Sequence, residues 1–432
     1  MGVANQIAAL FGGAVPVRIE AYDGSAAGPP DAASTLVVRR PRALARLIQR
    51  PGELGIVRAY VSGDVDFDGD IFALLATAVD AGLRPDPKAV PALVAAAGAD
   101  LWRIPPPPPE EVRLQGGLHS RGRDRAAISH HYDVSNAFYR MVLGPSMVYS
   151  CGVWSSPEAG LEAAQEAKLE LVCRKLALEP GMRLLDLGCG WGSMVIHAAR
   201  HHGVSSVGIT LSTEQAELAR ERVKEAGVDD LVDIRLQDYR DVRDGPFDAI
   251  SSIGMFEHVG RRRIEEYNTT LMGLLRPEGR LLNHAIARPG YPQGTSTAGR
   301  ARALGRRLAT AIGSDLTSRI DSPLMKRYVF PDGELHEVGV VVSLLQENGF
   351  EVRHLESIRE HYDLTLRAWV ANLEANWDDA VAEVGEGRAR VWRLYMAACA
   401  INFALGGVQV HQVLAVKPGA RGTSGMPWRP DF

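Results

Sequence analysis

A glycine-rich turn after an apolar run is the feature of this sequence with the clearest chemical meaning. In the stretch LLDLGCGWG, Asp186 ends the apolar run and glycines follow at positions 188, 190 and 192. Glycines permit a tight turn and let a ligand approach the backbone beside a helix N-terminus. A dinucleotide fingerprint needs its third glycine one place later, where this chain has Ser193. The spacing therefore favours S-adenosylmethionine over NAD as the cofactor.

The next apolar run, in SVGITLSTEQ, lacks the acidic residue that often binds a ribose in folds of this kind. Thr210 and Gln215 stand there instead. We therefore expect ribose recognition to depend on other polar groups.

Several other side chains could react or bind a ligand, yet each alone has a plainer explanation. Cys151, in MVYSCGVW, could be a nucleophile, a metal ligand or a small buried hydrophobic residue, and an ordinary thiol is mostly protonated at neutral pH. Glu257 and His258 are adjacent, but HExxH spacing is absent and neighbours on one strand or turn point apart, so we expect no metal. His284 could be a hydrogen-bonded strand residue, and Tyr362 could cap a loop.

An alternation of strands and helices must position these residues. From about residue 126 a helical stretch leads to the first of seven apolar runs, which are separated by helical patterns. This order predicts an open, mostly parallel α/β sheet. The expected strands are RLLDLG, SVGITL, VDIRLQD, FDAISSIG, GRLLNHAIA, FEVRHLESI and VQVHQVLAV.

A run of five prolines, in IPPPPPEE at 104–111, divides the chain. Such a run cannot continue a helix or a central strand, so we expect a stiff extended spacer. The stretch before it mixes strand-like and helical patterns and predicts a smaller α+β domain. The expected parts are an N-terminal domain at 1–103, a linker at 104–125, a catalytic domain at 126–418 and a tail at 419–432.

Composition excludes several classes of protein. A length of 432 residues predicts at least two domains, and a net charge of -4 argues against a nucleic-acid-binding surface. Four cysteines in so long a chain do not form a disulfide framework, which favours the reducing cytoplasm. The N-terminus resembles no signal peptide, and no apolar stretch is long enough to span a membrane.

Taken together and in their order, the motifs carry a family resemblance. They are SHHYDVSNAFY, MVYSCGVW, LLDLGCGWG, GITLSTEQ, QDYRD, GMFEHVG and RYVFPDGEL. With them the sequence resembles the cyclopropane-fatty-acyl-phospholipid synthase family over about 126 to 415. The piece PGELGIVRAYVSGDVDFDGD resembles the additional domain of the phospholipid-acting synthases, which the related mycolic acid cyclopropane synthases lack.

The resemblance implies a class I methyltransferase with a Rossmann-like seven-stranded sheet and a definite chemistry. A methyl group would pass from S-adenosylmethionine to the cis double bond of a phospholipid acyl chain, and loss of a proton to bound bicarbonate would close a cyclopropane. An alkene is a poor nucleophile and its methylation leaves a carbocation, so the site needs alignment, dryness and a base that is not itself alkylated.

The same resemblance implies roles for individual residues. Glu257 would accept the proton of the bicarbonate and hold His284, because a bare carboxylate would repel the anion. The bicarbonate site would consist of Cys151, Glu257, His284, the backbone at Ile286, and Tyr362. The cofactor site would consist of Tyr149, Ser150, Asp186, Gly188, Cys189, Gly190, Gly192, Thr210, Leu211, Gln215, Asp238 and Tyr239.

Alternatives stay open at this level. The same cation could lose a different proton and give a 10-methylene fatty acid, which a separate flavin- or NADPH-dependent reductase would convert to a methyl branch. A non-catalytic lipid-binding protein could keep the fold without releasing S-adenosylhomocysteine. By analogy we expect a homodimer, paired through the N-terminal lipid-binding or dimerisation domain, at the cytoplasmic face of the inner membrane.

A basic insertion at 288–326 suggests how the protein would reach lipid. Its part ARALGRRLATAIGSDL places leucines on one side of a possible helix and Arg302, Arg306 and Arg307 on another. A short basic amphipathic helix suits an anionic membrane surface. A solvated lid over the active site is the alternative.

Overall fold

A seven-stranded sheet carries the glycine-rich turn, and all of its strands lie where the sequence predicted them. They are β5 (Arg183–Leu187), β6 (Ser205–Thr210), β7 (Val232–Leu236), β8 (Phe247–Ile253), β9 (Leu275–Ala287), β10 (Glu351–Ser357) and β11 (Gln409–Val416). Their order is β10-β11-β9-β8-β5-β6-β7. Pairing is parallel from β9 through β7, whereas β11 runs antiparallel to β9 and β10. The predicted α/β, mostly parallel sheet is confirmed.

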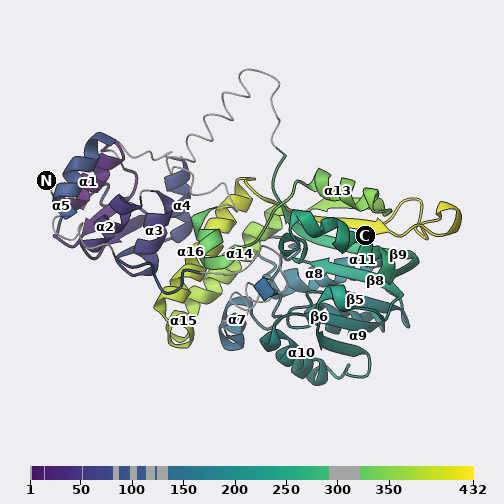
Figure 1. Ribbon diagram of the computed structural model, residues 1–432. Coiled ribbons are helices and arrows are strands. Elements are labelled where there is room, and N and C mark those ends of the chain that lie inside the picture. Colours follow the sequence, from purple (N-terminus) through teal and green to yellow (C-terminus); the bar gives the residue numbers. More distant parts are fainter. Residues whose placement is uncertain are drawn as a thin grey trace, which may run out of the picture. The chain divides into compact units, whose positions relative to one another are not determined.

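Helices cover both faces of this sheet (Figure 1). The helices of this part are α7 (Asn136–Leu143), α8 (Leu161–Leu176), α9 (Ser193–His202), α10 (Thr213–Glu225), α11 (Ile264–Leu274), α13 (Val338–Glu347) and α14 (Arg359–Ala375). Apolar residues of α8 and α9 pack with Leu184 and Leu282 on one face. Those of α11 and α13 pack with Leu185 and Leu281 on the other. Burial on both faces explains why the central strands are continuous apolar runs.

Two helices begin beside the glycine motif, each directly after a short turn. Gly192 precedes α9 with a φ of 82°, a left-handed conformation that glycine adopts without strain. The side chain of Ser212 accepts a hydrogen bond from the Gln215 amide at 3.2 Å and so caps α10. Both helices therefore begin at the carboxyl ends of β5 and β6. The remaining short helices here are Tyr239–Asp241, Phe256–His258, Arg261–Arg263 and Ala420–Gly422.

A second, four-stranded sheet lies in the N-terminal part, in the order β2-β1-β3-β4. Its strands are β1 (Arg18–Ala21), β2 (Ala26–Ala27), β3 (Ser34–Val38) and β4 (Val65–Gly69). Its helices are α1 (Val3–Leu10), α2 (Arg42–Gln49), α3 (Glu53–Val61), α4 (Ile71–Asp80), the short Pro87–Ala89 and α5 (Val90–Ala97). The fully buried Asp64 carboxylate connects the end of α3 to α2, because it forms ion pairs with Arg42 and Arg46 at 2.7 and 3.0 Å.

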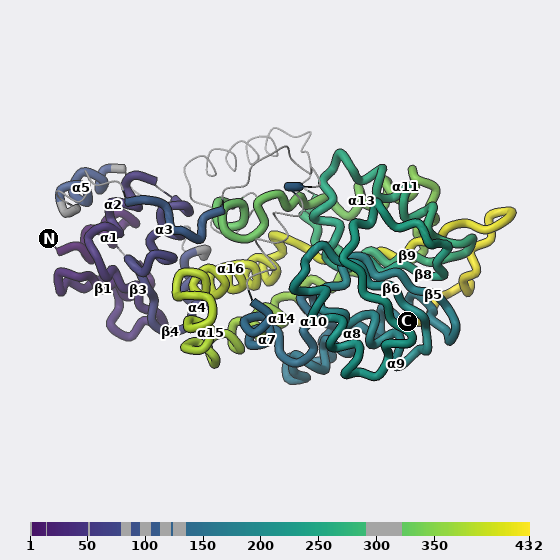
Figure 2. Tube along the Cα trace, turned by 60° about the horizontal axis from the view of Figure 1, so that its bottom comes forward, coloured from purple at the N-terminus to yellow at the C-terminus, as the bar shows by residue number. Residues whose placement is uncertain are grey.

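The chain forms two compact units, and their composition differs from the expected contiguous ranges. The first contains the described residues of Met1–Arg113, Tyr291–Val329 and Trp377–Asn402, and the second those of Leu114–Gly290, Phe330–Asn376 and Phe403–Phe432. The late helices α15 (Trp377–Val384) and most of α16 (Glu386–Ala404) thus belong with the N-terminal elements, beside which Figure 2 shows them. Arg390 explains this, since its buried guanidinium donates to Asp66 Oδ2 at 2.8 Å and lies 5.1 Å from the Tyr60 ring.

The proline run belongs to the first unit as well. Its described residues form neither helix nor strand, as predicted. The Pro106 carbonyl accepts from Arg46 at 3.0 Å, and the Glu111 carboxylate accepts from Arg58 and Arg327. Within this unit the run is therefore held by side chains rather than standing apart as a spacer.

The structure, a computed structural model, describes residues 2–13, 15–50, 52–80, 87–97, 105–112, 122–123, 135–290 and 322–432. Most of the basic insertion, 291–321, lies outside these residues, so its role as lid or membrane contact stays a prediction. Among the described helices, none is long and apolar enough to cross a bilayer.

Candidate active site

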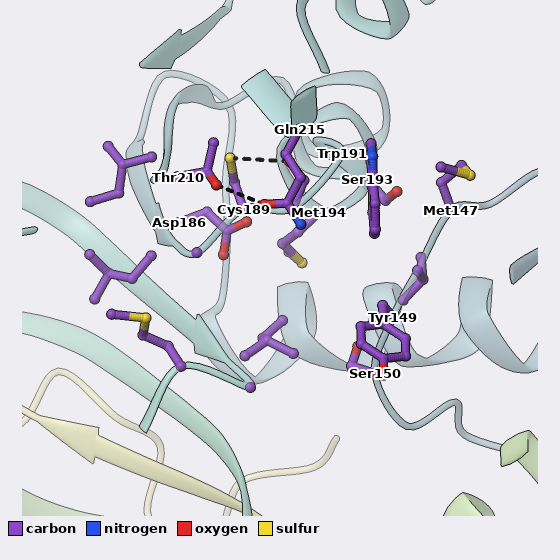
Figure 3. Close-up of a pocket in the computed structure, with 18 of the residues that line it drawn as sticks. Met147, Tyr149, Ser150, Asp186, Cys189, Trp191, Ser193, Met194, Thr210 and Gln215 are labelled. Carbon is purple, nitrogen blue, oxygen red and sulfur yellow. Dashed lines mark hydrogen bonds between the residues drawn. The ribbon is translucent and has the colours of Figure 1, made fainter. Parts of the chain in front are cut away.

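A pocket lies at the carboxyl ends of β5 and β6, where open α/β sheets generally bind ligands. Figure 3 shows Asp186, Thr210 and Gln215 on one side of it, with Tyr149 and Ser150 opposite. Ten of the predicted cofactor residues line the pocket. They are Tyr149, Ser150, Asp186, Gly188, Cys189, Gly190, Thr210, Leu211, Gln215 and Tyr239.

The glycine turn forms the floor of the pocket. Gly188 directly follows β5 with a φ of 70°, so another residue there would be strained. The Cys189 amide donates to the Ile209 carbonyl at 2.9 Å and ties the turn to β6. Gly192 does not line the pocket; its amide closes the turn on the Cys189 carbonyl at 3.0 Å.

A buried acid and a buried ammonium face this pocket. Asp186 is 3% exposed, accepts a hydrogen bond from Ser251 at 2.6 Å, and has its pKa raised to about 7 by burial. Lys168, on α8, is 1% exposed and donates to the Ser150 hydroxyl at 3.2 Å, and burial lowers its pKa to about 8. A carboxyl and an ammonium group in one pocket complement the two charged groups of an amino acid.

The sequence did not lead us to predict Lys168 in this site, although its position among apolar residues could have indicated it. On α8 it lies four residues after Ala164 and four before Val172, both of which are buried. A lysine on the apolar face of a helix needs a partner or a function. Gln237, Met255 and His258 also line the pocket and were not predicted to do so.

An aromatic wall orients Tyr149. Its ring lies 5.8 Å from that of Tyr139 on α7 and 5.2 Å from that of Trp369 on α14. Trp191, from the glycine turn, lies 4.6 Å from Tyr139 and donates to Asn136 at 2.7 Å. Faces of aromatic rings attract cations, so this wall suits a positively charged ligand centre.

The side chains at the carboxyl end of β6 are uncharged, as the sequence predicted. The Thr210 hydroxyl donates to Gln215 Oε1 at 2.7 Å and accepts from the Ser212 amide at 3.2 Å. Because the amide oxygen of Gln215 is used in this way, its NH2 group is the part left for a ligand. Both side chains are about 5% exposed and line the pocket.

Asp238 does not line the pocket. Its carboxylate forms a two-point ion pair with Arg240, with distances of 2.8 Å to Nε and 2.6 Å to Nη2. Its neighbours Gln237 and Tyr239 face the pocket instead. The predicted contact of Asp238 with the adenine therefore competes with this ion pair.

Glu257 is the best-defined member of the predicted bicarbonate site. It lies in the short Phe256–His258 helix after β8, and its Oε1 accepts from the Ile286 amide at 2.6 Å. Its Oε2 is buried and makes no hydrogen bond within the described part of the chain. Burial raises the pKa of this carboxyl to about 7. An orphaned acceptor of this kind suits a small ligand with an O–H group.

His284 precedes Ile286 by two positions on β9, so both side chains point to the same face of the sheet. The imidazole is 2% exposed, and its Nδ1 lies 3.3 Å from Gln412 Nε2. Burial and the charges of Lys168 and Lys175 lower its pKa to about 3, so the ring is neutral.

The Cys151 thiol is fully buried and is held as a thiol. Its Sγ donates to the Gly152 carbonyl at 3.2 Å and lies 3.6 Å from the Ile358 carbonyl. Burial raises its pKa well above the ordinary value, which leaves little thiolate for nucleophilic attack. The Gly152 amide donates to Thr365 at 3.1 Å and so ties this segment to α14.

Tyr362 lies on α14, three residues before Thr365. Its ring stands 4.6 Å from Phe403 and 6.0 Å from Trp369, the ring that also contacts Tyr149. Tyr362 is therefore linked to Tyr149, on the cofactor side of the pocket, through the Trp369 ring. Glu257, in contrast, is joined directly to the Ile286 amide by one hydrogen bond.

Outside the pocket, side chains of the types that bind metal ions lie close together. Within the described residues one group, Cys173, His197 and His202, brings its ligand atoms within 4.8 Å of one another. Glu170 instead accepts from both imidazoles, at 3.2 and 3.0 Å. None of these residues lines the pocket, and the expectation of no metal stays a prediction.

The sheet topology, with a glycine turn under a pocket at the first parallel strand, defines a class I methyltransferase that uses S-adenosylmethionine. The family model described as mycolic acid cyclopropane synthetase matches residues 119–413. A Mycobacterium tuberculosis protein described as a "probable fatty acid methyltransferase" is 45% identical over 427 residues, which cover 96% of this chain and 94% of that protein. The chain therefore belongs to the mycolic acid cyclopropane synthetase family and is an S-adenosylmethionine-dependent methyltransferase.

Two further relatives agree with this assignment. The cyclopropane-fatty-acyl-phospholipid synthase of Escherichia coli K12 is 34% identical over 379 residues, covering 87% of this chain and 86% of that protein. The crystal structure of a mycolic acid cyclopropane synthase complexed with SAH and CTAB matches with a TM-score of 0.58 and 31% identity, over 68% of this chain and 98% of that one. The family expected from the sequence motifs is confirmed.

Proposed function

We propose that this methyltransferase acts on the cis double bond of unsaturated phospholipid acyl chains and forms a cyclopropane, with bicarbonate as the base. One observation carries the proposal beyond the family: the buried Glu257 carboxyl has an unpaired oxygen in a region whose other titratable groups are held protonated or neutral. No strong base is therefore present among Cys151, Glu257 and His284, which favours a bound one.

The pocket residues fit the cofactor. Lys168 and Asp186 complement the carboxylate and ammonium of its methionine part, with Ser150 holding the lysine. Thr210 and Gln215 offer neutral groups to the ribose. Tyr239 lines the pocket and would lie near the adenine, where a contact by Asp238 would compete with its ion pair to Arg240.

The anion site fits bicarbonate by the chemistry of its groups. Glu257 Oε2 would accept the O–H of the anion, while Oε1 stays on the Ile286 amide. The Cys151 thiol and the His284 imidazole are neutral and each carries one hydrogen, which the thiol would turn from the Gly152 carbonyl toward the anion. Neutral donors offset the negative charge without competing for the proton that must be removed.

When bound, S-adenosylmethionine supplies the methyl carbon and bicarbonate supplies a basic oxygen. The residues of the chain align the two and exclude water. Tyr149, Trp369 and Tyr362 present aromatic faces, which stabilise a cation without forming a bond to it. In both outcomes a proton leaves the transferred carbon. Direct ring closure gives the cyclopropane, whereas a hydride shift from the methylated carbon to its cationic neighbour before the proton leaves gives the 10-methylene alternative, which needs a separate reductase.

The substrate would be reached from the cytoplasmic face of the membrane. We infer that the basic insertion contacts anionic lipid and that the first unit supports a homodimer. Replacing Arg302, Arg306 and Arg307 with glutamate should weaken binding to anionic vesicles and leave cofactor affinity unchanged. Unaltered vesicle binding would remove the membrane role.

The test of the main proposal uses the purified protein with vesicles of dioleoyl phosphatidylglycerol and S-adenosylmethionine. We expect release of S-adenosylhomocysteine and cyclopropane protons in the NMR spectrum of the lipid. Removing carbon dioxide from the buffer should slow the reaction, and added bicarbonate should restore it. Exocyclic =CH2 protons in the product lipid, in place of cyclopropane protons, would indicate the methylene product. Absence of S-adenosylhomocysteine would support a non-catalytic lipid-binding protein.

A further inference from the structure

A row of polar side chains crosses the sheet and ends at His284. On adjacent strands, Glu356 of β10 is directly opposite Gln412 of β11, which is directly opposite His284 of β9. Residues opposite one another in neighbouring strands project to the same face. The row therefore leads from the edge strand to the proposed anion site.

Lys175, on helix α8, contacts two members of this row. Its fully buried ammonium pairs with the Glu356 carboxylate and donates to Gln412 Oε1 at 2.8 Å. Gln412 is also fully buried, and its Nε2 lies 3.3 Å from His284 Nδ1. The order of contacts is carboxylate, ammonium, amide and imidazole.

The donors and acceptors in this order fix where the hydrogens lie. An ammonium only donates, so the Gln412 atom facing Lys175 must be its oxygen. The amide nitrogen then faces His284 and can only donate, so Nδ1 must be an unprotonated acceptor. A neutral imidazole carries one N–H, which is therefore at Nε2. Within the described residues, Nε2 of His284 makes no hydrogen bond.

We propose that Lys175 and Gln412 are positioning residues that hold His284 in the Nε2–H tautomer, so that it donates a hydrogen bond to the anion of the reaction. This inference rests on the proposed role of His284 in the bicarbonate site. In the other tautomer Nε2 would present a lone pair, which would repel the anion and compete with it for the proton. Here the donor would place the anion rather than stabilise a developing charge, and we take the loss of about 100-fold known for one preorganised donor as the expected size of the effect.

The alternative is that the row only fills the interior with satisfied polar groups. A pair of variants separates the two possibilities. Glu356→Gln with Gln412→Glu moves the carboxylate one strand inward, keeps the net charge and keeps an ion pair with Lys175. Since a carboxylate only accepts, it would take a hydrogen from His284 Nδ1 and reverse the tautomer. Glu356→Gln alone is the control, because Lys175 still orients the Gln412 amide.

The experiment measures both the tautomer and the turnover. The full chain is labelled with ¹⁵N-histidine, and His284→Gln assigns the signal in a two-bond ¹H–¹⁵N correlation spectrum. We expect Nε2–H in the parent protein and in Glu356→Gln, and Nδ1–H in the double variant. We also expect the double variant to lose about 100-fold in kcat on oleoyl vesicles while its dissociation constant for S-adenosylmethionine changes less than about threefold.

Three results would overturn the proposal: Nδ1–H in the parent protein, no change of tautomer in the double variant, or a reversed tautomer with unchanged kcat. The first and last results would also remove the donor role of His284, and none of the three would by itself exclude the proposed reaction. If the parent releases no S-adenosylhomocysteine, the proposed reaction fails, and the ¹⁵N spectrum still decides the tautomer. Gln412→Met provides a second variant, which should give mixed tautomers and a smaller loss of kcat than the double variant.

Discussion

Replacing Glu257 with glutamine should stabilise the protein and inactivate it. The parent carboxyl has its pKa raised from 4.5 to about 7 because it is buried without a countercharge. The folded state therefore binds a proton more tightly than the unfolded chain, and stability falls as pH rises from about 4.5 to about 7. At about 1.4 kcal/mol per pKa unit, the ionised carboxyl costs about 3 kcal/mol above pH ~7.

Glutamine removes this cost and nearly keeps the shape. Its oxygen can still accept from the Ile286 amide, where Oε1 now accepts at 2.6 Å. Its NH2 group replaces the unpaired Oε2, so an acceptor for the anion becomes a donor. We expect kcat to fall about 100-fold or more, with little change in cofactor affinity.

Equilibrium urea unfolding between pH ~4.5 and ~8.5 measures the stability difference. The free energies of unfolding of the parent and Glu257→Gln should coincide at the acid end, separate through the range and differ by about 3 kcal/mol above pH ~7. Glu347→Gln, at an exposed position on α13, is the control and should follow the parent. A variant less stable than the parent at pH ~8, or one that keeps its kcat, would refute the reasoning.

Three further predictions concern the cofactor pocket and the thiol. Lys168→Met should weaken S-adenosylmethionine binding about 10- to 100-fold in calorimetry, because a buried charged donor is lost; unchanged affinity would remove Lys168 from the site. Since burial raises the pKa of Asp186 to about 7, cofactor affinity should fall up to about tenfold per unit as pH drops below ~7, with proton release on binding, and a flat profile would contradict the pairing. Cys151→Ser should keep cofactor binding and much of the activity, since a hydroxyl can also donate; a loss as large as that of Glu257→Gln would show that the sulfur itself is needed.

The sequence predicted what depends on local pattern. All seven strands of the larger sheet were located from apolar runs and turns, because strands buried on both faces have few polar interruptions. Ten of the twelve residues expected at the cofactor from the glycine turn and the family motifs line the pocket. The side chains at the ends of β5 and β6 could thus be predicted from the sequence alone.

What the sequence did not predict depends on contacts between distant segments. The membership of α16 in the first unit depends on Arg390 meeting Asp66, residues that no local pattern connects. The row of Glu356, Gln412 and His284 depends on the register of three strands, which period-two patterns do not fix across strands.

Burial is the common cause of the chemistry proposed for this site. It raises the pKa values of Cys151 and Glu257 and lowers that of His284, so each group moves toward its uncharged form. A thiolate or a free imidazole base beside a sulfonium would itself be methylated, because both are better nucleophiles than an alkene. The thiol is protected because it keeps its proton. The neutral imidazole is protected because its Nδ1 lone pair accepts from Gln412 while, in the proposed tautomer, Nε2 carries the hydrogen, so the alkene is left as the reacting nucleophile. The segment MVYSCGVW, with Cys151 as a protonated donor beside the cofactor residues Tyr149 and Ser150, is understandable in these terms.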